Sequence, residues 1–339
     1  MIKAAIIGAS GYSGEELIRV LTGHPECEIT VITSRQYAGG QVGKVFPRFA
    51  WLDLKFSMPD VDKIAECADI VFLALPHGLA AEYAKPLFNA GLKVIDISAD
   101  FRVKDTEIYK KYYKTDHPAP ELLKNAVYGL PEIYREDIKN ASLIACAGCY
   151  PTSILLPSVP LLKAGIVSPE NIVVTSMSGV TGAGRKVDLP YIFPEINESV
   201  RAYAVSGHRH LSEIEQELSE ASGEKTAINF IPHLVPVNRG INSTIIFRPG
   251  KNFAEDAVKN TLDTAYAAEK FVRILPQGEL ADTKHVTLTN FCEIGHVYDK
   301  HTGNIIVTSV IDNLTKGASG QAVQCMNIMT GKGETEGLL

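Results

Sequence analysis

Cys149 is the residue of this sequence best placed to act as a nucleophile. It lies in the stretch Cys146-Ala147-Gly148-Cys149-Tyr150-Pro151-Thr152. The apolar residues Leu143–Ala145 before it predict a strand. Pro151 suits the first turn of a helix, because its missing N–H would have no partner there anyway. We therefore expect Cys149 at a strand-to-helix junction, where helix N–H groups and the helix dipole favour the thiolate, which is the nucleophilic form.

The other cysteines point to structure rather than chemistry. Cys146 lies in the predicted strand end, and most free cysteines are small buried hydrophobic residues. Cys146 and Cys149 form a C-x-x-C pair, but no second Cys/His pair lies at zinc-finger spacing, so we expect no metal site. The six cysteines are otherwise dispersed, and a reducing compartment would keep them as thiols.

A second group of reactive side chains is Gly207-His208-Arg209-His210, followed by Glu213. Apolar residues recur at helical spacing over 211–218, so the group lies at the start of a predicted helix. Histidine transfers protons near neutral pH, and Glu213 is near enough in sequence to orient one. Catalysis and structure remain equally good interpretations. Within the group we favour His208 for proton transfer because it follows Gly207, and His210 for substrate contact or structure.

The start of the chain predicts a dinucleotide site. The apolar run Lys3–Ile7 leads into Gly8-Ala9-Ser10-Gly11-Tyr12-Ser13-Gly14 and then a helical pattern over Glu15–Thr22. Glycines let the backbone approach a pyrophosphate closely, and the helix N-terminus supplies N–H donors. The spacing G-x-x-G-x-x-G is one residue longer than the commonest fingerprint. The alternative interpretation is a tight turn without a ligand.

Ser34-Arg35 indicates which dinucleotide binds. The pair ends the second predicted strand, Glu28–Thr33. An NAD-preferring site usually has Asp or Glu there for the ribose 2′-hydroxyl. A hydroxyl and a guanidinium suit a 2′-phosphate instead, so we predict NADP(H). The alternative is that Arg35 is an ordinary surface arginine.

Strands and helices alternate through the first half of the chain. Helical patterns near Asp60–Cys67 and over Leu79–Asn89 alternate with the apolar runs Ile70–Leu75 and Lys93–Ile97. This order predicts a Rossmann-type, doubly wound parallel sheet of the α/β class. Ligands of such sheets lie beyond the carboxyl ends of the strands. The polar residues over 105–140 are expected to form connecting or rim structure.

Two strand ends are therefore of interest, Leu75-Pro76-His77-Gly78 and Ser98-Ala99-Asp100-Phe101-Arg102. Arg102 could hold a phosphate or carboxylate through two parallel N–H groups. A structural pair between Arg102 and the nearby Asp100 is about as good an interpretation.

Strand patterns dominate the second half. A helix opened by Pro151 should be short or kinked, because it contains Pro157 and Pro160. The glycine-rich loop 179–185 is expected to close over cofactor or substrate, with a mobile surface loop as the alternative. One long helix is predicted over Ala254–Glu269. The predicted strands are Val173–Ser178, Ile228–Ile231, Asn242–Phe247, Val272–Leu275, Asn290–Val297 and Asn304–Ile311, with a hairpin turn at Asp299–Gly303.

These patterns predict two domains. Residues 1–148 form an NADP-binding Rossmann domain, and the apolar C-terminal helix in 312–339 completes it, since its apolar face must be buried. Residues 149–311 form an α+β domain with a largely antiparallel sheet, which carries Cys149 and His208.

Composition favours small-molecule partners. The chain has 339 residues and a net charge of −6 without a dense run of Lys and Arg, so we expect neither nucleic acid nor an anionic membrane as a partner. No apolar stretch approaches the ~20 residues of a membrane-spanning helix. Met1-Ile2-Lys3 leads directly into a predicted strand, so we expect no signal peptide and a cytoplasmic location.

Five motifs together carry a resemblance to a known family: Gly8–Gly14, Asp96–Arg102, Gly148–Thr152, Gly207–His210 with Glu213, and Asp312-Asn313-Leu314 with Lys316-Gly317-Ala318. End to end, the sequence resembles the N-acetyl-gamma-glutamyl-phosphate reductases, which belong with the aspartate-semialdehyde dehydrogenase-like superfamily and catalyse the NADPH-dependent third step of arginine biosynthesis. Many members have a proline before Gly-Cys where this sequence has Ala147, and this difference changes no catalytic group.

The resemblance implies a mechanism and a set of site residues. Cys149 would attack an acyl phosphate to give a thioester, NADPH would deliver hydride, and the thiohemiacetal would collapse to a semialdehyde, with His208 as acid/base. A homodimer or homotetramer is implied. The implied substrate-binding residues are Arg102, Arg209, His210 and Glu213. The implied cofactor-binding residues are Gly8, Ser10, Gly11, Tyr12, Ser13, Gly14, Ser34 and Arg35, with Pro76, Gly182, Ala183, Gly184 and Asn313 at the nicotinamide end.

Two alternatives stay open from the residues. A related enzyme could reduce aspartyl phosphate or a carrier-linked aminoadipyl phosphate, because the sequence does not specify the acyl group. A non-enzymatic NADP-binding sensor would keep Gly8–Gly14 but would not need Cys149 and His208 together. Side chains of Cys149 and His208 far apart would favour the sensor.

Overall fold

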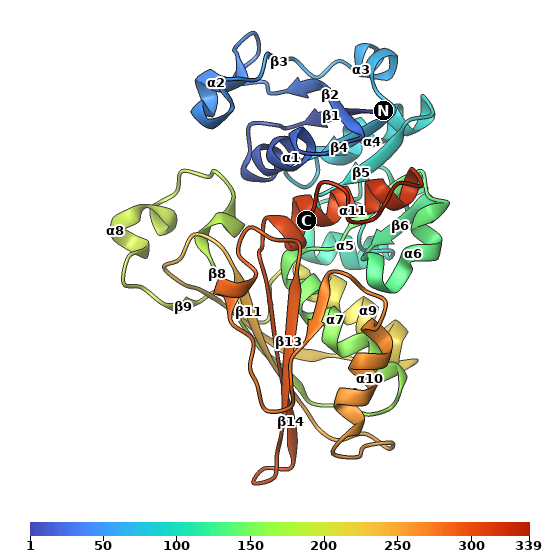
Figure 1. Cartoon of the computed structure of the whole chain (residues 1–339), viewed down its shortest axis with the longest axis vertical. Helices are drawn as coiled ribbons and strands as arrows, with labels where there is room; N and C mark the ends of the chain where they lie inside the picture. Colours follow the sequence, from blue (N-terminus) through green and yellow to red (C-terminus); the bar gives the residue numbers. More distant parts are fainter. The chain divides into compact units, whose positions relative to one another are not determined.

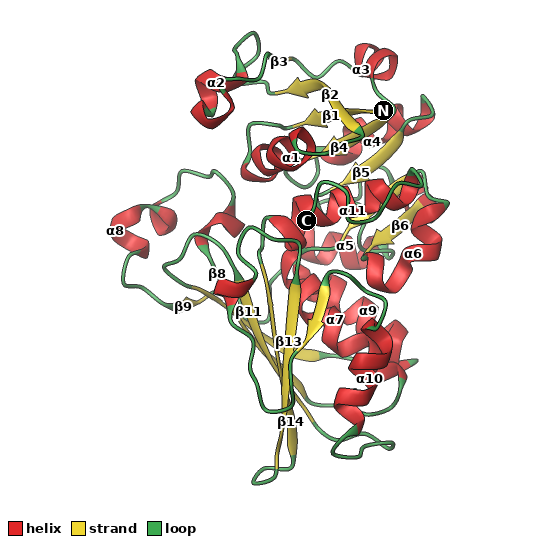
Figure 2. Ribbon diagram, viewed as in Figure 1, coloured by secondary structure: helices red, strands yellow, loops and turns green.

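A sheet of seven strands forms the centre of the first of two units, in the order β3-β2-β1-β4-β5-β7-β6 (Figures 1 and 2). All neighbouring strands in it are parallel. The structure is a computed structural model that describes residues 1–339. The strands are β1 (Ile2–Ile7), β2 (Cys27–Thr33), β3 (Phe56–Ser57), β4 (Ile70–Leu73), β5 (Lys93–Asp96), β6 (Ala126–Gly129) and β7 (Leu143–Cys146).

Helices cover both faces of this sheet. Successive side chains of a strand point to opposite faces, so a strand with apolar residues at successive positions must be covered on both sides. Ile6 of β1 belongs to the core that contains helices α1 and α11, and Ile7 belongs to the core that contains α3 and α4. The prediction of a doubly wound sheet is confirmed. The helices are α1 (Tyr12–Thr22), α2 (Val42–Val45), α3 (Val61–Cys67), α4 (Ala80–Asn89), α6 (Pro131–Lys139) and α11 (Gly320–Met329).

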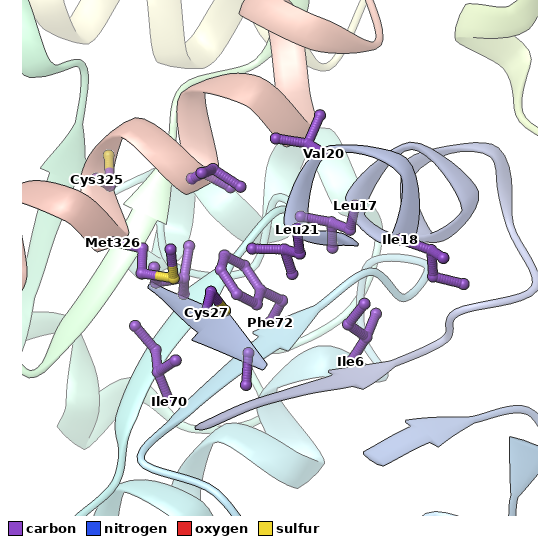
Figure 3. Close-up of a cluster of buried hydrophobic side chains, with 14 of the residues drawn as sticks. Ile6, Leu17, Ile18, Val20, Leu21, Cys27, Ile70, Phe72, Cys325 and Met326 are labelled. Carbon is purple, nitrogen blue, oxygen red and sulfur yellow. The ribbon is translucent and has the colours of Figure 1, made fainter. Parts of the chain in front are cut away.

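Helix α11 is buried along its whole length. Figure 3 shows Met326 of this helix in one cluster with Leu21 of α1 and Phe72 of β4. Full burial of such a side chain contributes roughly 1.5–3 kcal/mol. The last helix of the chain is therefore part of the core of the first unit.

Residues 105–140, interpreted from the sequence as connecting or rim structure, include a strand at the edge of the sheet, so the connecting interpretation is wrong for that strand. The segment contains α5 (Thr106–Tyr113), β6 and α6, and β6 is an edge strand that pairs with β7. Four residues of β6 gave too short a pattern to recognise, and pairing with β7 rather than local sequence makes them a strand.

The chain groups into two units, and residues 312–317, which the sequence assigns to the first domain, group with the second. The first unit comprises Met1–Lys110, Thr115–Gly148 and Ala318–Leu339, and the second comprises Lys111–Lys114 and Cys149–Gly317.

A second sheet of seven strands organises the second unit, in the order β12-β13-β14-β11-β8-β10-β9. Only β12 with β13 and β8 with β10 are parallel pairs, so the prediction of a largely antiparallel α+β unit is confirmed. The elements are α7 (Cys149–Lys163), β8 (Ile172–Ser178), α8 (Phe193–Ile196), β9 (Arg201–Ala202), α9 (His210–Ser222), β10 (Ile228–Leu234), β11 (Ile241–Phe247), α10 (Ala257–Tyr266), β12 (Val272–Ile274), β13 (Cys292–Asp299) and β14 (Asn304–Ile311).

One face of this sheet packs against α7. The hydroxyl of Ser153 on α7 hydrogen-bonds to Ser243 of β11, which in turn bonds to Ser176 of β8, both at 2.7 Å. All three serines are fully buried. Residues of the opposite parity, such as Met177, therefore lie on the other face, where Met177 is 46% exposed.

Helix α7 continues through both of its prolines over 15 residues, so it is not short, and the alternative expectation, a kink at the prolines, stays a prediction. Pro160 lacks the N–H that would donate to the carbonyl of Leu156, one helical turn earlier. The hydroxyl of Tyr266, on α10, donates to that carbonyl instead. A tertiary hydrogen bond thus replaces the missing helical one. No helix of the chain is long and apolar enough to cross a bilayer.

Candidate active site

Cys149 is the first residue of α7, and the strand β7 ends shortly before it at Cys146. This is the strand-to-helix junction that the sequence predicts. Cys146 is fully buried, as a structural cysteine would be, whereas Cys149 is half-buried. Cys149 therefore combines partial access with the positive end of a helix dipole.

Two tyrosines adjoin the thiol. The hydroxyls of Tyr150 and Tyr203 hydrogen-bond to each other at 2.9 Å. Burial raises the pKa of both phenols, and the charge of Cys149 acts in the same direction on each. Both hydroxyls therefore stay protonated near the sulfur and can serve as hydrogen-bond donors.

His208 lies in the same aromatic group. The rings of Tyr150, Phe230 and Tyr203 pack edge-on against its imidazole, with centroid distances of 5.3, 5.5 and 5.6 Å. Cys149 and His208 are thus brought to the same two tyrosines, Tyr150 and Tyr203. The segment from β9 to the start of α9 carries both Tyr203 and His208.

The surroundings of His208 decide its protonation. Burial, and then the charge of Arg209, lower its pKa from 6.5 to about 4. The backbone N–H of His210 donates to Nδ1 of His208 at 3.1 Å. Since Nδ1 accepts, the neutral ring carries its proton on Nε2. His208 is therefore a neutral hydrogen-bond donor through Nε2–H at neutral pH.

The other residues of this group lie at the start of α9. Arg209 is the N-cap residue, and its guanidinium lies 5.7 Å from the centroid of the Tyr113 ring. His210 packs edge-on against both His208 and Tyr150. Glu213 is fully buried in the first turn. Arg209 and His210 therefore lie beside the rings that surround His208, and Glu213 lies in the interior of the second unit.

A strained turn leads into His208. Ala204 and Ser206 have positive φ angles of 47° and 60°, which cost energy for residues other than glycine. A Cβ at Gly207 would meet nothing within 4 Å, so packing within the chain does not require glycine there. This turn joins Tyr203 to His208, whose rings are in contact, and no pattern in the sequence indicates it.

Arg102 lies in a turn built around buried carboxylates. Asp100 is fully buried and accepts hydrogen bonds from the N–H groups of Gly78 at 2.6 Å and Ala81 at 3.0 Å. It thereby fixes the turn after β4 to the turn after β5. Arg102 is buried too, and it donates to the carbonyl of Ile97 at 2.8 Å.

Two further side chains hold this turn from the following segment. The Tyr109 hydroxyl donates to the Asp100 carboxylate at 3.1 Å. Nδ1 of His117 accepts from the N–H of Ala119, so Nε2 carries the proton and donates to the Asp100 carbonyl at 2.5 Å. The backbone around Arg102 is therefore held rigidly.

The glycine loop after β1 fits a dinucleotide. Gly8 has a positive φ of 87°, and a Cβ there would clash with the Ala74 backbone. A Cβ at Gly14 would lie 2.5 Å from the Ala9 Cα, so glycine permits close packing of α1 on the loop. A Cβ at Gly11 would meet only the Gly8 oxygen, at 3.7 Å. Gly11 is thus not needed for packing, and its bare backbone leaves room for a pyrophosphate at the start of α1.

The residues chosen for NADP(H) lie around the same loop. Ser10 and Ser34 hydrogen-bond through their hydroxyls at 2.9 Å, which joins the glycine loop to the end of β2. Arg35 is exposed, and its guanidinium donates to the hydroxyl of Tyr83 on α4 at 2.8 Å. Tyr83 therefore orients the arginine that we assign to the 2′-phosphate. Tyr12 and Ser13 begin α1, and the carbonyl of Ser13 accepts from Ser319.

The remaining cofactor candidates lie at two places. Pro76 is exposed in the turn after β4 in the first unit. In the second unit, Gly182, Ala183 and Gly184 follow β8, and Asn313 follows β14. Asn313 donates to the Thr181 hydroxyl at 3.0 Å and accepts from the Gly240 N–H at 2.8 Å. Asn313 thus holds the start of the loop at Thr181.

Sequence reasoning did not single out Tyr83 or Tyr203, and it considered Asp100 only as a partner of Arg102. Each acts through contacts distant in sequence, so no local pattern reveals it. No group of three or more His, Cys, Asp or Glu side chains is arranged to hold a metal ion.

Comparison with known proteins gives a family match for each part of the chain. Residues 3–141 match the family described as semialdehyde dehydrogenase, NAD binding domain, and residues 149–313 match semialdehyde dehydrogenase, dimerisation domain. Among solved structures, aspartate semialdehyde dehydrogenase II of Vibrio cholerae, complexed with ASA, has a TM-score of 0.75 at 18% identity and covers 98% of both chains. The Candida albicans enzyme with NADP has a TM-score of 0.73 at 17% identity, over 97% of this chain and 99% of that chain. These likenesses show the fold.

Much more similar sequences give the family. An N-acetyl-gamma-glutamyl-phosphate reductase of Akkermansia muciniphila is 52% identical over 99% of this chain and 98% of its own length. One from Citrifermentans bemidjiense is 51% identical over 100% of this chain and 98% of its own length. These matches span the whole length of the chain and so include both units. The chain belongs to the N-acetyl-gamma-glutamyl-phosphate reductase family.

Proposed function

We propose that this chain reduces N-acetyl-gamma-glutamyl phosphate with NADPH, giving N-acetylglutamate semialdehyde and phosphate, through a thioester on Cys149. The observation that carries the mechanism is the shared setting of Cys149 and His208 against Tyr150 and Tyr203. A non-enzymatic NADP-binding sensor would not need these side chains together, so their convergence favours the enzyme. The curated relatives carry the name of the reductase, which favours this acyl group over aspartyl or aminoadipyl phosphate.

The first step is acyl transfer to sulfur. The Cys149 thiolate attacks the acyl carbon, a C–S bond forms, and the C–O bond to the phosphoryl group breaks to release phosphate. The positive end of the α7 dipole favours the attacking thiolate. Arg102 is proposed to bind the phosphoryl group, because a guanidinium held by a rigid turn can match two phosphate oxygens. Arg209 and His210 are proposed to contact the substrate, and buried Glu213 to support them from the first turn of α9.

His208 is proposed to donate from Nε2. Negative charge develops on the acyl oxygen in both steps, and a preorganised donor in a water-poor site stabilises it. The tautomer set by His210 supports donation to this oxygen rather than removal of the thiol proton. The protonated tyrosines can hold this donor in place, since their rings surround the imidazole.

The first unit is proposed to bind NADP(H). The residues that would hold the pyrophosphate are those of the Gly8–Gly14 loop, including Ser10, while Ser34 and Arg35 would receive the 2′-phosphate. Pro76, the Gly182–Gly184 loop and Asn313 are assigned to the nicotinamide end. When bound, NADPH supplies the hydride that reduces the thioester.

A homodimer or homotetramer is part of the proposal. The second unit matches a family named for dimerisation. Its sheet has one face packed on helices, while the other face presents half-exposed side chains from β8 and β11, with Met177 the most exposed on β8. A sheet face of half-exposed side chains can be buried against a second copy.

The test is the reverse reaction. Purified protein is given NADP⁺, N-acetylglutamate semialdehyde and phosphate, and formation of NADPH is followed by absorbance. Turnover that requires phosphate and is clearly faster than with aspartate semialdehyde is expected. Faster turnover with aspartate semialdehyde would move the substrate to the related class, and no turnover with any semialdehyde would favour the sensor.

A further inference from the structure

Gly317 lies directly against Cys149. A Cβ at position 317 would be 2.8 Å from the Cys149 Cβ, 3.2 Å from its Cα and 3.1 Å from Cδ1 of Ile311. The first of these distances is below 3.0 Å, closer than real Cβ atoms approach other heavy atoms. Gly317 does not have a positive φ. Glycine is therefore required at this position by space and not by backbone conformation.

The backbone that presents Gly317 is held firmly. Thr315–Ser319 form a π-helical turn, an element that is frequent at functional sites. The N–H of Gly317 donates to the carbonyl of Asp312 at 2.9 Å, and Asp312 is fully buried. The Asp312 carboxylate accepts from the N–H groups of Leu288, Leu314 and Thr315 and from the guanidinium of Arg239. Because these hydrogen bonds fix the backbone at Gly317, it cannot easily move to make room for an added methyl group.

We propose that Gly317 is a positioning residue for the nucleophile: its bare backbone is the surface against which Cys149 rests, and it sets where the sulfur lies. This inference rests on the proposed role of Cys149 and adds a residue to which no catalytic part has been assigned. A side chain at position 317 would push the first residue of α7 away. Since a displacement of about 1 Å at a reacting group can cost about 10²-fold in rate, the effect should fall on turnover.

The first experiment measures Gly317→Ala kinetics and the alkylation of Cys149 by iodoacetamide, located by mass spectrometry. We expect kcat to fall by about 10²-fold, the KM for NADPH to stay unchanged, and the pH profile of Cys149 alkylation to shift. The matched control is Gly23→Ala. A Cβ at exposed Gly23 has no neighbour closer than 3.6 Å, so this variant should keep normal kinetics. Normal kcat and normal alkylation in Gly317→Ala would overturn the inference.

The second experiment applies when Gly317→Ala is unstable. The thermal midpoint is compared for wild type, Gly317→Ala, Cys149→Gly and the double variant. Removing the Cys149 Cβ relieves the shortest contact, so Gly317→Ala should lower the midpoint less in the Cys149→Gly background. An equal loss in both backgrounds, or a double variant that does not fold although Cys149→Gly does, would show that other neighbours require glycine and would refute the inference.

Different results would refute the thioester mechanism on Cys149 and the positioning role of Gly317. Retained turnover in Cys149→Ser would refute the thioester mechanism, whereas the coupling of midpoints between positions 149 and 317 would be unaffected. Loss of turnover in Cys149→Ser together with normal kinetics in Gly317→Ala would refute only the positioning role.

Discussion

Two separate features of its surroundings keep His208 neutral. Burial and the Arg209 charge lower its pKa to about 4. The N–H of His210 points at Nδ1, and a proton on Nδ1 would face that N–H and lose the hydrogen bond. Both features act against the imidazolium. The ring is therefore a donor through Nε2 over the whole neutral range.

His208→Asn should lower kcat by about 10²–10³-fold, the usual cost of removing one donor to a developing oxyanion. In the wild type, a pH profile of kcat/KM should show an acid limb near the pKa of about 4 rather than near 6.5, because a proton on Nδ1 removes the hydrogen bond from the His210 N–H that orients the ring. That limb should be absent from His208→Asn. His210→Asn should mainly raise the KM for the acyl substrate. The opposite pattern, in which His210→Asn loses turnover and the limb, would transfer the role to His210.

Cys149→Ser should abolish reductase turnover, because a serine hydroxyl stays protonated where the thiol can ionise. NADPH binding should be retained, since the glycine loop belongs to the other unit. Turnover and cofactor titration on the same preparation check both points. Cys146→Ser serves as the matched control for a neighbouring cysteine outside the reaction.

At the scale of elements, the end of β5 carries a buried carboxyl group, Asp96, whose charged form is unfavourable. Burial, and then the charge of Asp100, raise the pKa of Asp96 from 3.8 to about 7. Its carboxylate accepts from the N–H and hydroxyl of Ser98. The protonated form is favoured in the folded state, so stability from this group is complete below the unfolded pKa and is lost as pH rises through the folded pKa.

Asp96→Asn should remove that pH dependence. For the wild type, the free energy of unfolding should contain a component that decreases between about pH 4 and about pH 7. The variant cannot ionise, so its unfolding midpoint should decline less over the same interval. Urea unfolding at a series of pH values measures both. An identical pH slope in the two proteins would contradict the assignment.

The contact between the end of β2 and α4 should control cofactor choice. Arg35→Ala is expected to raise the KM for NADPH with little change in kcat, because the guanidinium contributes binding energy alone. Tyr83→Phe removes the hydroxyl that holds Arg35 and should have a smaller effect of the same kind. Neither variant should alter the KM for NADH, which lacks the 2′-phosphate. Equal use of NADH and NADPH by the wild type would refute the assignment.

At the scale of the whole molecule, the second sheet is proposed to pair with another copy. Met177→Lys places a charge on its uncovered face and should shift the protein toward monomer in analytical ultracentrifugation, since an unpaired charge is costly to bury. Met58→Lys is the matched control, because Met58 is 55% exposed and lies in the first unit. An unchanged sedimentation coefficient for Met177→Lys would place the interface elsewhere.

The sequence by itself determined the features that depend on local spacing. The apolar run, the glycines and the helical spacing of apolar residues located the strand, loop and helix at the start of the chain. The Gly-Cys pair before a proline located Cys149 at a helix N-terminus. Such features are readable because neighbouring residues alone decide backbone geometry and the direction of the helix dipole. The absence of Asp or Glu at Ser34-Arg35, which predicts NADP(H), is likewise read from local sequence alone.

Only the tertiary structure decided the features that join distant segments. It made β6 an edge strand by pairing it with β7, and it kept α7 whole by supplying the hydroxyl of Tyr266. It brought Tyr203 to Tyr150 and Gly317 to Cys149. Burial and partner identity set the pKa and tautomer of His208. These properties depend on which residues meet across long stretches of chain, and local propensity and spacing do not encode that.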